Sequence, residues 1–179
     1  DIADLLNLVI YKDDHVIALN KPPGLAVQGG TRINRHIDGM LDGLRFGAAE
    51  RPRLVHRLDR DTSGILLLGR SANAAARLAS TFRSKEAIKT YWALTMGVPN
   101  PAAGRIDLAV VKRPTNLGER IVADAVSGKS AVTHYAVKAQ AGKKIAWIVL
   151  KPRTGRTHQL RVHCAALGVP IIGDRKYGG

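Results

Sequence analysis

The sequence predicts an α+β fold built on a mixed, mostly antiparallel bent sheet that is flanked by helices and loops. Two observations predict this class. Short apolar runs typical of strands outnumber the helical patterns, and turn signals join many of these runs as hairpins. The chain has 179 residues, 45% of them hydrophobic, which is enough to bury a sizeable core. We expect residues 1–179 to form one domain.

The first part of the chain predicts a hairpin, a loop and a short helix. Residues 8–11 and 16–19 are apolar runs around a polar turn, as in two paired strands. The prolines and glycine of residues 22–24 end regular structure. Residues 28–36 are typical of an exposed loop, and apolar side chains at helical spacing predict a short helix over 37–46.

A buried strand and an amphipathic helix are expected next. Residues 65–68 are four consecutive aliphatic side chains, which favours a strand in the core. Ser71 can accept a hydrogen bond as the N-cap of a helix that runs to about Lys85. Apolar residues recur every four positions from Ala74, so this helix is expected to bury one side.

The following stretch predicts further strands. Residues 88–96 alternate, with Trp92 on one face and Lys89 and Tyr91 on the other, which we expect to be the polar, solvated face. Residues 105–139 carry the turn signals and short apolar runs of a meander of hairpins. Lys144 to Leu150 predicts another strand.

A helix over residues 158–167 is predicted near the end of the chain. Thr157 can cap it, and Gly168, followed shortly by a proline, ends it. Arg161 projects from its first turn, beside exposed backbone N–H groups that attract anions. Cys164 lies on its apolar stripe.

Composition and charge narrow the function. Lys and Arg number 28 against 14 Asp and Glu, a net charge of +14, which indicates a polyanionic partner: nucleic acid first, an anionic membrane surface second. The single cysteine, Cys164, excludes an internal disulfide or a Cys-pair metal site and favours a reducing compartment, the cytoplasm. No apolar run approaches the ~18 residues of a membrane span, and no secretion signal opens the chain.

Residues 56–64, HRLDRDTSG, are the densest polar stretch. Asp59 is flanked by Arg57 and Arg60, whose charges are expected to lower its pKa and keep it ionised. That suits a nucleophile or an electrostatic stabiliser, and it does not suit a general acid. Taken alone, Asp59 is better explained as an acidic loop residue in a salt bridge, and Asp61 as a turn-forming residue.

Other candidates have structural explanations as well. Tyr91 on a solvated face could stack on a base or move a proton, although an ordinary cross-strand aromatic explains it better when it is taken alone. The basic run over residues 151–163 could be a solvated face. His158 and His163 are five apart with no Asp, Glu or Cys to complete a set, so we expect no metal site. Motifs for dinucleotide, P-loop, nucleophile-elbow and zinc-deaminase chemistry are absent from the sequence.

Taken together and in this order, the motifs resemble those of the RluA-type pseudouridine synthase family. The resemblance rests on residues 16–24 (VIALNKPPG), 56–64 (HRLDRDTSG), 89–93 (KTYWA), 128–133 (GKSAVT), 154–163 (TGRTHQLRVH) and 173–178 (GDRKYG). It is closest to the ribosomal large-subunit, RluC-like members. It implies a central basic catalytic cleft and isomerisation of uridine to pseudouridine in structured RNA, with ribosomal RNA as the substrate and transfer RNA as the alternative. No cofactor or metal is implied, and a cytoplasmic monomer is expected.

The resemblance assigns roles residue by residue. Asp59 matches the catalytic aspartate, which either attacks the sugar carbon or takes a 2′ proton. Arg161 matches the arginine that pairs with this aspartate. Tyr91 matches the active-site tyrosine that packs on the target base. Arg57 matches a position that enters the RNA stack when the uridine is flipped out. The remaining residues expected to grip RNA are Lys21, Arg60, Lys89, Arg156 and His158.

The resemblance also bears on the extent of the chain and on alternative functions. The sequence ends soon after Tyr177, where family members continue with further strands, and an N-terminal RNA-binding domain is absent. We therefore expect residues 1–179 to be a trimmed catalytic core. A noncatalytic basic RNA-binding module is one alternative, although Asp59 among arginines opposes it. A nucleic-acid glycosylase is another, but it needs a second carboxylate, for which Asp61 is the only close candidate.

Overall fold

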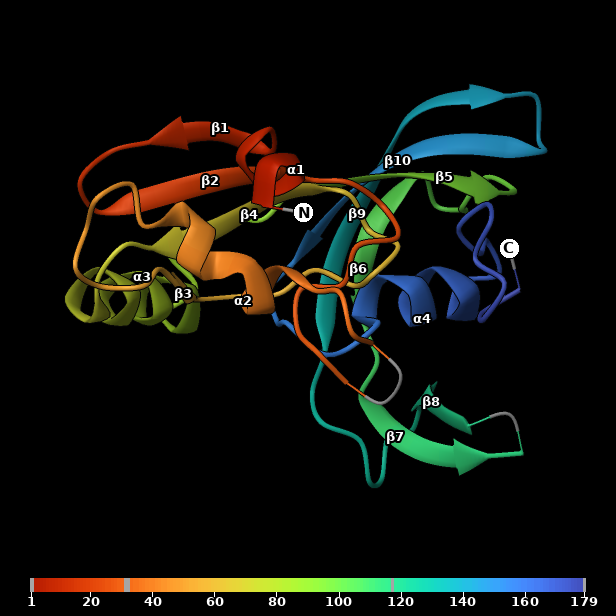
Figure 1. Ribbon diagram of the computed structural model, residues 1–179. Helices are drawn as coiled ribbons and strands as arrows, with labels where there is room; N and C mark the ends of the chain where they lie inside the picture. The colour runs from red at the N-terminus through yellow and green to blue at the C-terminus, as the bar shows by residue number, and fades with distance from the viewer. Residues whose placement is uncertain (1, 31–32, 117, 179) are drawn as a thin grey trace. The chain divides into compact units, whose positions relative to one another are not determined.

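The computed structural model describes residues 2–30, 33–116 and 118–178, which fall into two compact units, Asp1–Ala87 and Ile88–Gly179. Figure 1 shows the elements of both units. All pairings between the named strands of the described residues are antiparallel. The predicted α+β class with a mostly antiparallel sheet is confirmed. The single catalytic domain and the basic cleft stay predictions.

The first unit is a four-stranded sheet with short helices. Its elements are α1 (Ile2–Leu6), β1 (Val9–Lys12), β2 (Val16–Lys21), α2 (Ile37–Met40), the 3-10 helix η1 (Leu41–Leu44), β3 (Arg53–Leu54), β4 (Gly64–Gly69) and α3 (Ala72–Arg83). The strand order is β1-β2-β4-β3. The predicted hairpin, short helix and buried strand are therefore confirmed.

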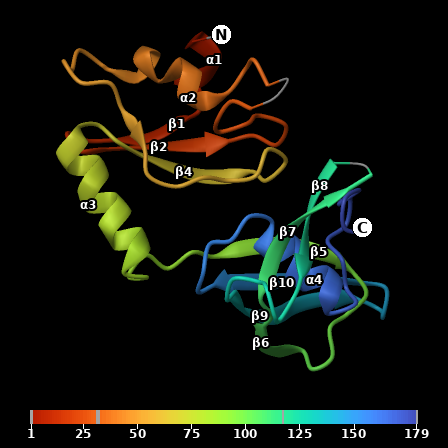
Figure 2. The same cartoon turned by 90° about the horizontal axis from the view of Figure 1, so that it is seen from below.

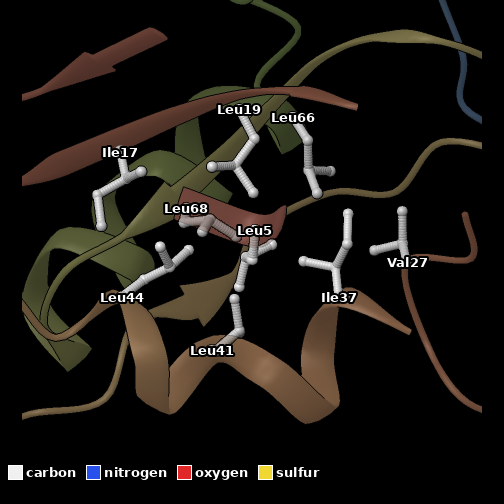
Figure 3. Packing of buried hydrophobic residues seen from close by; sticks show 9 residues of the cluster. All are labelled: Leu5, Ile17, Leu19, Val27, Ile37, Leu41, Leu44, Leu66 and Leu68. Atoms are coloured by element: carbon white, nitrogen blue, oxygen red, sulfur yellow. The ribbon is translucent and has the colours of Figure 1, made fainter. Parts of the chain in front are cut away.

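One face of this sheet carries the core of the first unit. Leu19 of β2 lies opposite Leu66 of β4, and Ile17 lies opposite Leu68, so all four side chains point to the same face. Figure 3 shows them meeting buried side chains from the helices and the connecting loop, namely Leu5, Val27, Ile37, Leu41 and Leu44. Burial of each such side chain contributes about 1.5–3 kcal/mol, so this face anchors β2 and β4.

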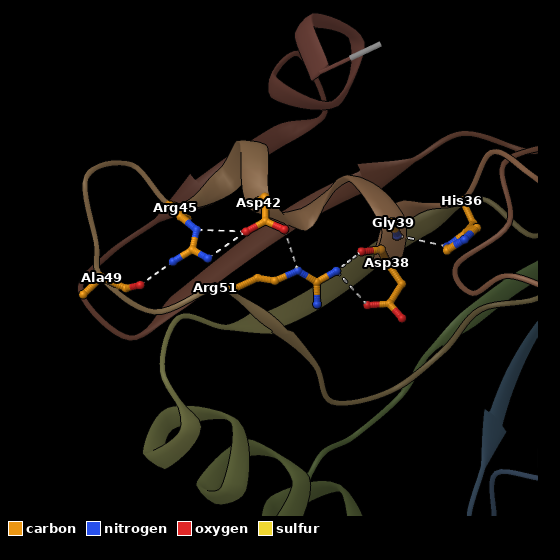
Figure 4. A network of polar contacts seen from close by, with 7 residues as sticks. All are labelled: His36, Asp38, Gly39, Asp42, Arg45, Ala49 and Arg51. Atoms are coloured by element: carbon orange, nitrogen blue, oxygen red, sulfur yellow. Dashed lines mark hydrogen bonds and ion pairs between the residues drawn. The ribbon is translucent and has the colours of Figure 1, made fainter.

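A network of polar contacts fixes the loop that leads into β3. Arg51 bridges Asp38 and Asp42, and Arg45 also binds Asp42 (Figure 4). His36 caps α2, because its Nδ1 accepts from an amide of the first turn. The ion pairs are exposed, and such pairs stabilise by only about 0–1 kcal/mol each. They order the segment rather than drive folding.

Helix α3 begins as the sequence predicts. The hydroxyl of Ser71 accepts a hydrogen bond from the N–H of Ala74 at 3.1 Å. Gly69 at the end of β4 is required by the close packing of this helix, since an added Cβ would lie 2.5 Å from the backbone of Ala75. The β4–α3 corner thereby stays tight.

The second unit holds a second four-stranded sheet, a separate hairpin and one helix (Figure 2). Its elements are β5 (Tyr91–Met96), β6 (Ala103–Asp107), β7 (Val110–Thr115), β8 (Gly118–Ala123), β9 (Val132–Ala141), β10 (Ile145–Pro152) and α4 (Gln159–Ala166). The sheet order is β5-β10-β9-β6, and β7 and β8 form a separate two-stranded sheet. No helix in the described part of the chain is long and apolar enough to span a membrane.

The inner face of the second sheet packs with α4, which corrects one prediction. Tyr91 and its face of β5 turn toward the core that contains Ile148 and Cys164, and Tyr91 is half-buried. Trp92 on the opposite face is 72% exposed and meets Trp147 edge-on. The prediction that Tyr91 lies on the solvated face was wrong, because α4 covers that face despite its more polar residues.

The beginning of α4 also differs from the prediction. His158, not Thr157, is the N-cap residue, and it adopts a left-handed conformation with φ 52° and no side-chain capping bond. The end of the helix is as predicted, since Gly168 has φ 80° and reverses the chain. A left-handed non-glycine residue at a helix start is uncommon and points to tertiary contacts that hold it there.

Candidate active site

The first part of the candidate site is a tight turn between β3 and β4. The N–H of Thr62 donates to the carbonyl oxygen of Asp59 at 3.1 Å, which closes the turn over Arg60 and Asp61. Asp59 is half-buried, whereas Arg60 and Asp61 are exposed. The turn thus places Asp59 in the connection that leads from β3 (Arg53–Leu54) into β4 (Gly64–Gly69).

Lys21 holds this turn from beneath. The side chain is 0% exposed, and its Nζ donates to the carbonyl oxygens of Pro22, Leu25 and Arg60 at 2.9, 2.8 and 2.9 Å. Three acceptors match the three hydrogens of an ammonium group. Burial lowers the pKa of Lys21, and the negative charges of Asp61 and Asp59 oppose that shift.

The prediction that Lys21 binds RNA is therefore wrong. A side chain without exposed surface, whose ammonium hydrogens go to backbone carbonyls, cannot reach a phosphate in this structure. The sequence did carry a signal for burial, because strand alternation places Lys21 on the same face as Ile17 and Leu19. Its role is to hold the turn that carries Asp59.

A reciprocal pair of bonds joins the same two segments. The N–H of Gly24 donates to the Arg60 carbonyl oxygen at 2.9 Å, and Nε of Arg60 donates to the Gly24 carbonyl oxygen at 3.1 Å. Gly24 has φ 85°, a conformation that favours glycine. These two bonds join the loop after β2 to the turn after β3.

His56 fixes the start of the polar stretch. Its Nε2 accepts from the N–H of Leu67 at 2.8 Å, and its ring packs 4.6 Å from that of Phe82 on α3. Because Nε2 accepts a hydrogen bond, the neutral ring carries its proton on Nδ1. Arg57, the next residue, is exposed and donates to the side-chain oxygen of Gln28 at 3.2 Å.

The second unit contributes Arg161 of α4. Its Nε and Nη2 donate to the two carboxylate oxygens of Asp174 at 2.7 and 2.9 Å. The side chains are 22% and 5% exposed, respectively. Burial alone would raise the pKa of Asp174, but the hydrogen bonds and charge of Arg161, together with hydrogen bonds from the backbone N–H groups of Lys176 and Tyr177, outweigh it and lower that pKa. Sequence reasoning did not single out Asp174.

Tyr91 is the first residue of β5, and Lys89 lies two residues before it. Tyr91 pairs in register with Leu150 of β10 and packs against the core that also receives Leu160 of α4. Lys89 is half-buried, and burial lowers its pKa. The Lys89 ammonium group lies close to Gly155, since a Cβ added to that glycine would be 3.3 Å from Nζ of Lys89.

The other predicted RNA contacts in the second unit differ in exposure. Arg156 is exposed and donates from Nε to the Ser130 carbonyl oxygen at 3.1 Å. His158 is half-buried, with Nδ1 2.7 Å from the hydroxyl of Tyr177. Both assignments stay predictions.

The structure therefore divides the predicted site residues between the units. Arg57, Asp59 and Arg60 belong to the first unit, and Tyr91 and Arg161 belong to the second. No group of three or more His, Cys, Asp or Glu residues suited to a metal ion occurs among the described residues. The catalytic roles stay predictions.

Comparisons with known proteins identify relatives. A family described as RNA pseudouridylate synthase matches residues 15–166. Ribosomal large subunit pseudouridine synthase C of Rickettsia prowazekii is 41% identical over 174 residues, 97% of this chain and 57% of the relative. RNA pseudouridine synthase 4, mitochondrial, of Arabidopsis thaliana is 45% identical over 194 residues, 96% of this chain and 41% of the relative.

A solved structure has the same fold. Human RNA Pseudouridylate Synthase Domain Containing 4 superposes with a TM-score of 0.83 at 33% identity, covering 98% of this chain and 70% of that one. The chain spans about half the length of the curated relatives it matches. The resemblance drawn from the ordered motifs is confirmed at the level of the family.

Proposed function

The chain belongs to the RNA pseudouridylate synthase family, and on that premise we propose that it isomerises uridine to pseudouridine in large-subunit ribosomal RNA. The observation that carries the proposal is the Asp59 turn, a carboxylate between two arginines held by a buried ammonium. The name of the Rickettsia relative supports the choice of ribosomal RNA.

The reaction conserves atoms and electrons. The bond between uracil N1 and sugar C1′ breaks, the base turns, and C5 bonds to C1′. The C5 hydrogen leaves as a proton and N1 gains one, so the reaction needs no oxidant or reductant. We assign the initiating step to Asp59, as attack on C1′ or removal of a 2′ proton, and assign Arg161 as its cationic partner.

Arg161 suits that role because of its contact with Asp174. A guanidinium presents two edges that can each receive a carboxylate. Asp174 takes the edge formed by Nε and Nη2, which fixes the direction of the other edge. A fixed cation lowers the pKa of a neighbouring carboxylate and keeps it ionised.

Access to the target base requires that the uridine leave its stack. We assign Arg57 to the space vacated by the flipped uridine, since it is exposed and lies two residues before Asp59, the first residue of the turn. Flipping costs a few kcal/mol, which phosphate contacts can offset. Arg60, Lys89, Arg156 and His158 are assigned to the RNA backbone. Arg60 also lines a pocket of about 390 Å³ with Pro22 and Asn34, next to the turn.

Release of tritium from RNA labelled at uridine C5 tests the proposal, because the new C–C bond expels that hydrogen. Transcripts of large-subunit ribosomal RNA and transfer RNA are compared at equal concentration. Release from the ribosomal transcript supports the proposal. Release from transfer RNA alone selects the alternative substrate, and salt-sensitive binding without release selects a noncatalytic RNA-binding module.

A further inference from the structure

The β7–β8 hairpin and helix α4 share a small core of their own. Val110 and Ile121 at the base of the hairpin are buried against Val162 of α4 and Tyr177 near the end of the chain. Beyond this base the hairpin is exposed, and in Figure 1 it extends away from the sheet of its unit. The packing places Tyr177 between an exposed arm and the helix that carries Arg161.

Residues 173–178, called here the clasp segment, join these two elements by polar contacts. The hydroxyl of Tyr177 accepts from the N–H of Ile121 on β8 at 3.2 Å and lies 2.7 Å from Nδ1 of His158. Nζ of Lys176 donates to the carbonyl oxygen of Glu119 on β8 at 2.6 Å. The left-handed His158 is thus held by a tertiary contact.

The Tyr177 ring also receives two cations. The guanidinium carbons of Arg120 and Arg161 lie 5.0 and 4.9 Å from its centre, within the range of cation–π attraction. Arg120 comes from the hairpin, and Arg161 comes from α4. The buried Tyr177 ring therefore contacts both elements, and its π face attracts the two guanidinium groups that would otherwise repel each other.

Asp174 completes the arrangement. Besides binding Arg161 through both oxygens, its carboxylate accepts from the N–H groups of Lys176 and Tyr177 at 3.1 and 3.3 Å. The same carboxylate that orients the guanidinium therefore folds the clasp segment that brings the Tyr177 ring against it. A guanidinium held at one edge and packed on a ring has little freedom to rotate.

We propose that Asp174 and Tyr177 are positioning residues for Arg161, and that the clasp segment sets the direction of its guanidinium. This inference rests on the proposed function, in which Arg161 is the partner of the reacting carboxylate. Asp174 acts on the reaction through Arg161 and does not touch the substrate. Tyr177 links the same guanidinium to the hairpin through Arg120.

The kinetic test uses Asp174→Asn, which keeps the shape of the side chain and removes its charge. The single-turnover rate of tritium release should fall about 10- to 100-fold, with RNA affinity within about two-fold of wild type and the circular dichroism spectrum unchanged. In an Arg161→Lys background the same change should cost less than about three-fold, because residues that act as a unit are not additive. An unchanged rate, or an equal loss in both backgrounds, would overturn the proposal.

Two variants of Tyr177 separate ring from hydroxyl. Tyr177→Phe keeps the aromatic face and should retain the rate within about three-fold, whereas Tyr177→Leu should lose about ten-fold. Arg175→Gln, at an exposed neighbour in the clasp segment, is the matched control and should leave the rate at saturating RNA unchanged. Equal rates for the Phe and Leu variants would contradict a role for the ring.

A measurement without turnover separates this inference from the proposed function. The measurement is hydrogen exchange of the Nε proton of Arg161, whose signal is identified by its absence in Arg161→Lys. This proton should exchange slowly with water in wild type and rapidly in Asp174→Asn. Fast exchange in wild type would overturn the positioning role. A protected Nε–H in a chain that releases no tritium would support the positioning role and count against the proposed function.

Discussion

The ammonium group of Lys21 donates a hydrogen bond to the carbonyl oxygen of Arg60, 39 residues further along the chain, at 2.9 Å. This bond ties the end of β2 to the turn that presents Asp59. Lys21 has no exposed surface, and a buried charge is tolerated only when it is satisfied by partners. The turn supplies one of the three acceptors of the Lys21 ammonium group. The position of Asp59 and the stability of the first unit therefore both depend on the Lys21 side chain.

Replacing Lys21 with methionine should lower both stability and turnover. The change leaves three carbonyl oxygens without their donor, and each unsatisfied buried group costs about 1–3 kcal/mol. The free energy of unfolding, measured in urea, should fall by about 2 kcal/mol or more. Tritium release should fall at least ten-fold under conditions where the variant is folded. Thr62→Val in the same turn is a milder control, and equal urea midpoints for Lys21→Met and wild type would contradict the anchoring role.

Stability should fall as the pH drops below about 6.5, the value for an unperturbed histidine. His163 is fully buried, with Nε2 2.9 Å from the Leu108 carbonyl oxygen and Nδ1 2.8 Å from the Thr133 hydroxyl. Burial lowers its pKa, against smaller opposing effects of the Leu108 carbonyl and the charge of Asp107. Below pH 6.5 the unfolded chain therefore binds a proton that the folded chain does not, which favours unfolding.

The measurement is urea unfolding at pH 7.5, 6.5 and 5.5 for wild type and His163→Gln. The variant cannot titrate at this position, so its free energy of unfolding should change less over this window, although it will be lower at pH 7.5. Parallel pH profiles for the two proteins would show that His163 does not cause the loss.

Tyr91→Phe should change the free energy of unfolding by no more than about 0.5 kcal/mol, as mild substitutions usually do. The same change should slow the reaction. The ring packs against the core beside α4, and phenylalanine retains that packing. General acid–base groups contribute about 10²- to 10⁴-fold, so we expect a rate loss of about 10²-fold if the hydroxyl moves a proton. Single-turnover tritium release measures it, and an unchanged rate would restrict Tyr91 to packing on the base.

RNA affinity should fall steeply with salt because the chain carries a net charge of +14. Each phosphate contact contributes a slope of about −0.7 to −0.9 to the dependence of log affinity on log salt. Arg156→Gln should reduce the magnitude of the slope by about 0.7 to 0.9, the contribution of one phosphate contact. Filter binding from 50 to 300 mM salt tests this, and a slope unaltered by the substitution would remove Arg156 from the interface.

Local signals in the sequence predict much of the fold. The Ser71 cap and the reversal at Gly168 depend on neighbouring residues alone, and both are confirmed. The face of Tyr91 could not be predicted, because alternation defines two faces and tertiary packing decides which one α4 covers. Asp174 was missed because its contact with Arg161 spans 13 residues and no spacing rule connects a helix to the loop after it.

The most direct test of the central claim compares wild type with Asp59→Asn in tritium release from C5-labelled ribosomal RNA, with RNA binding measured in parallel. Asparagine keeps the size of the side chain and removes the reacting carboxylate. We predict release by wild type, no detectable release by the variant, and RNA affinity within about two-fold for both. Release by Asp59→Asn at a rate close to that of wild type would contradict the assignment of Asp59 as the catalytic residue.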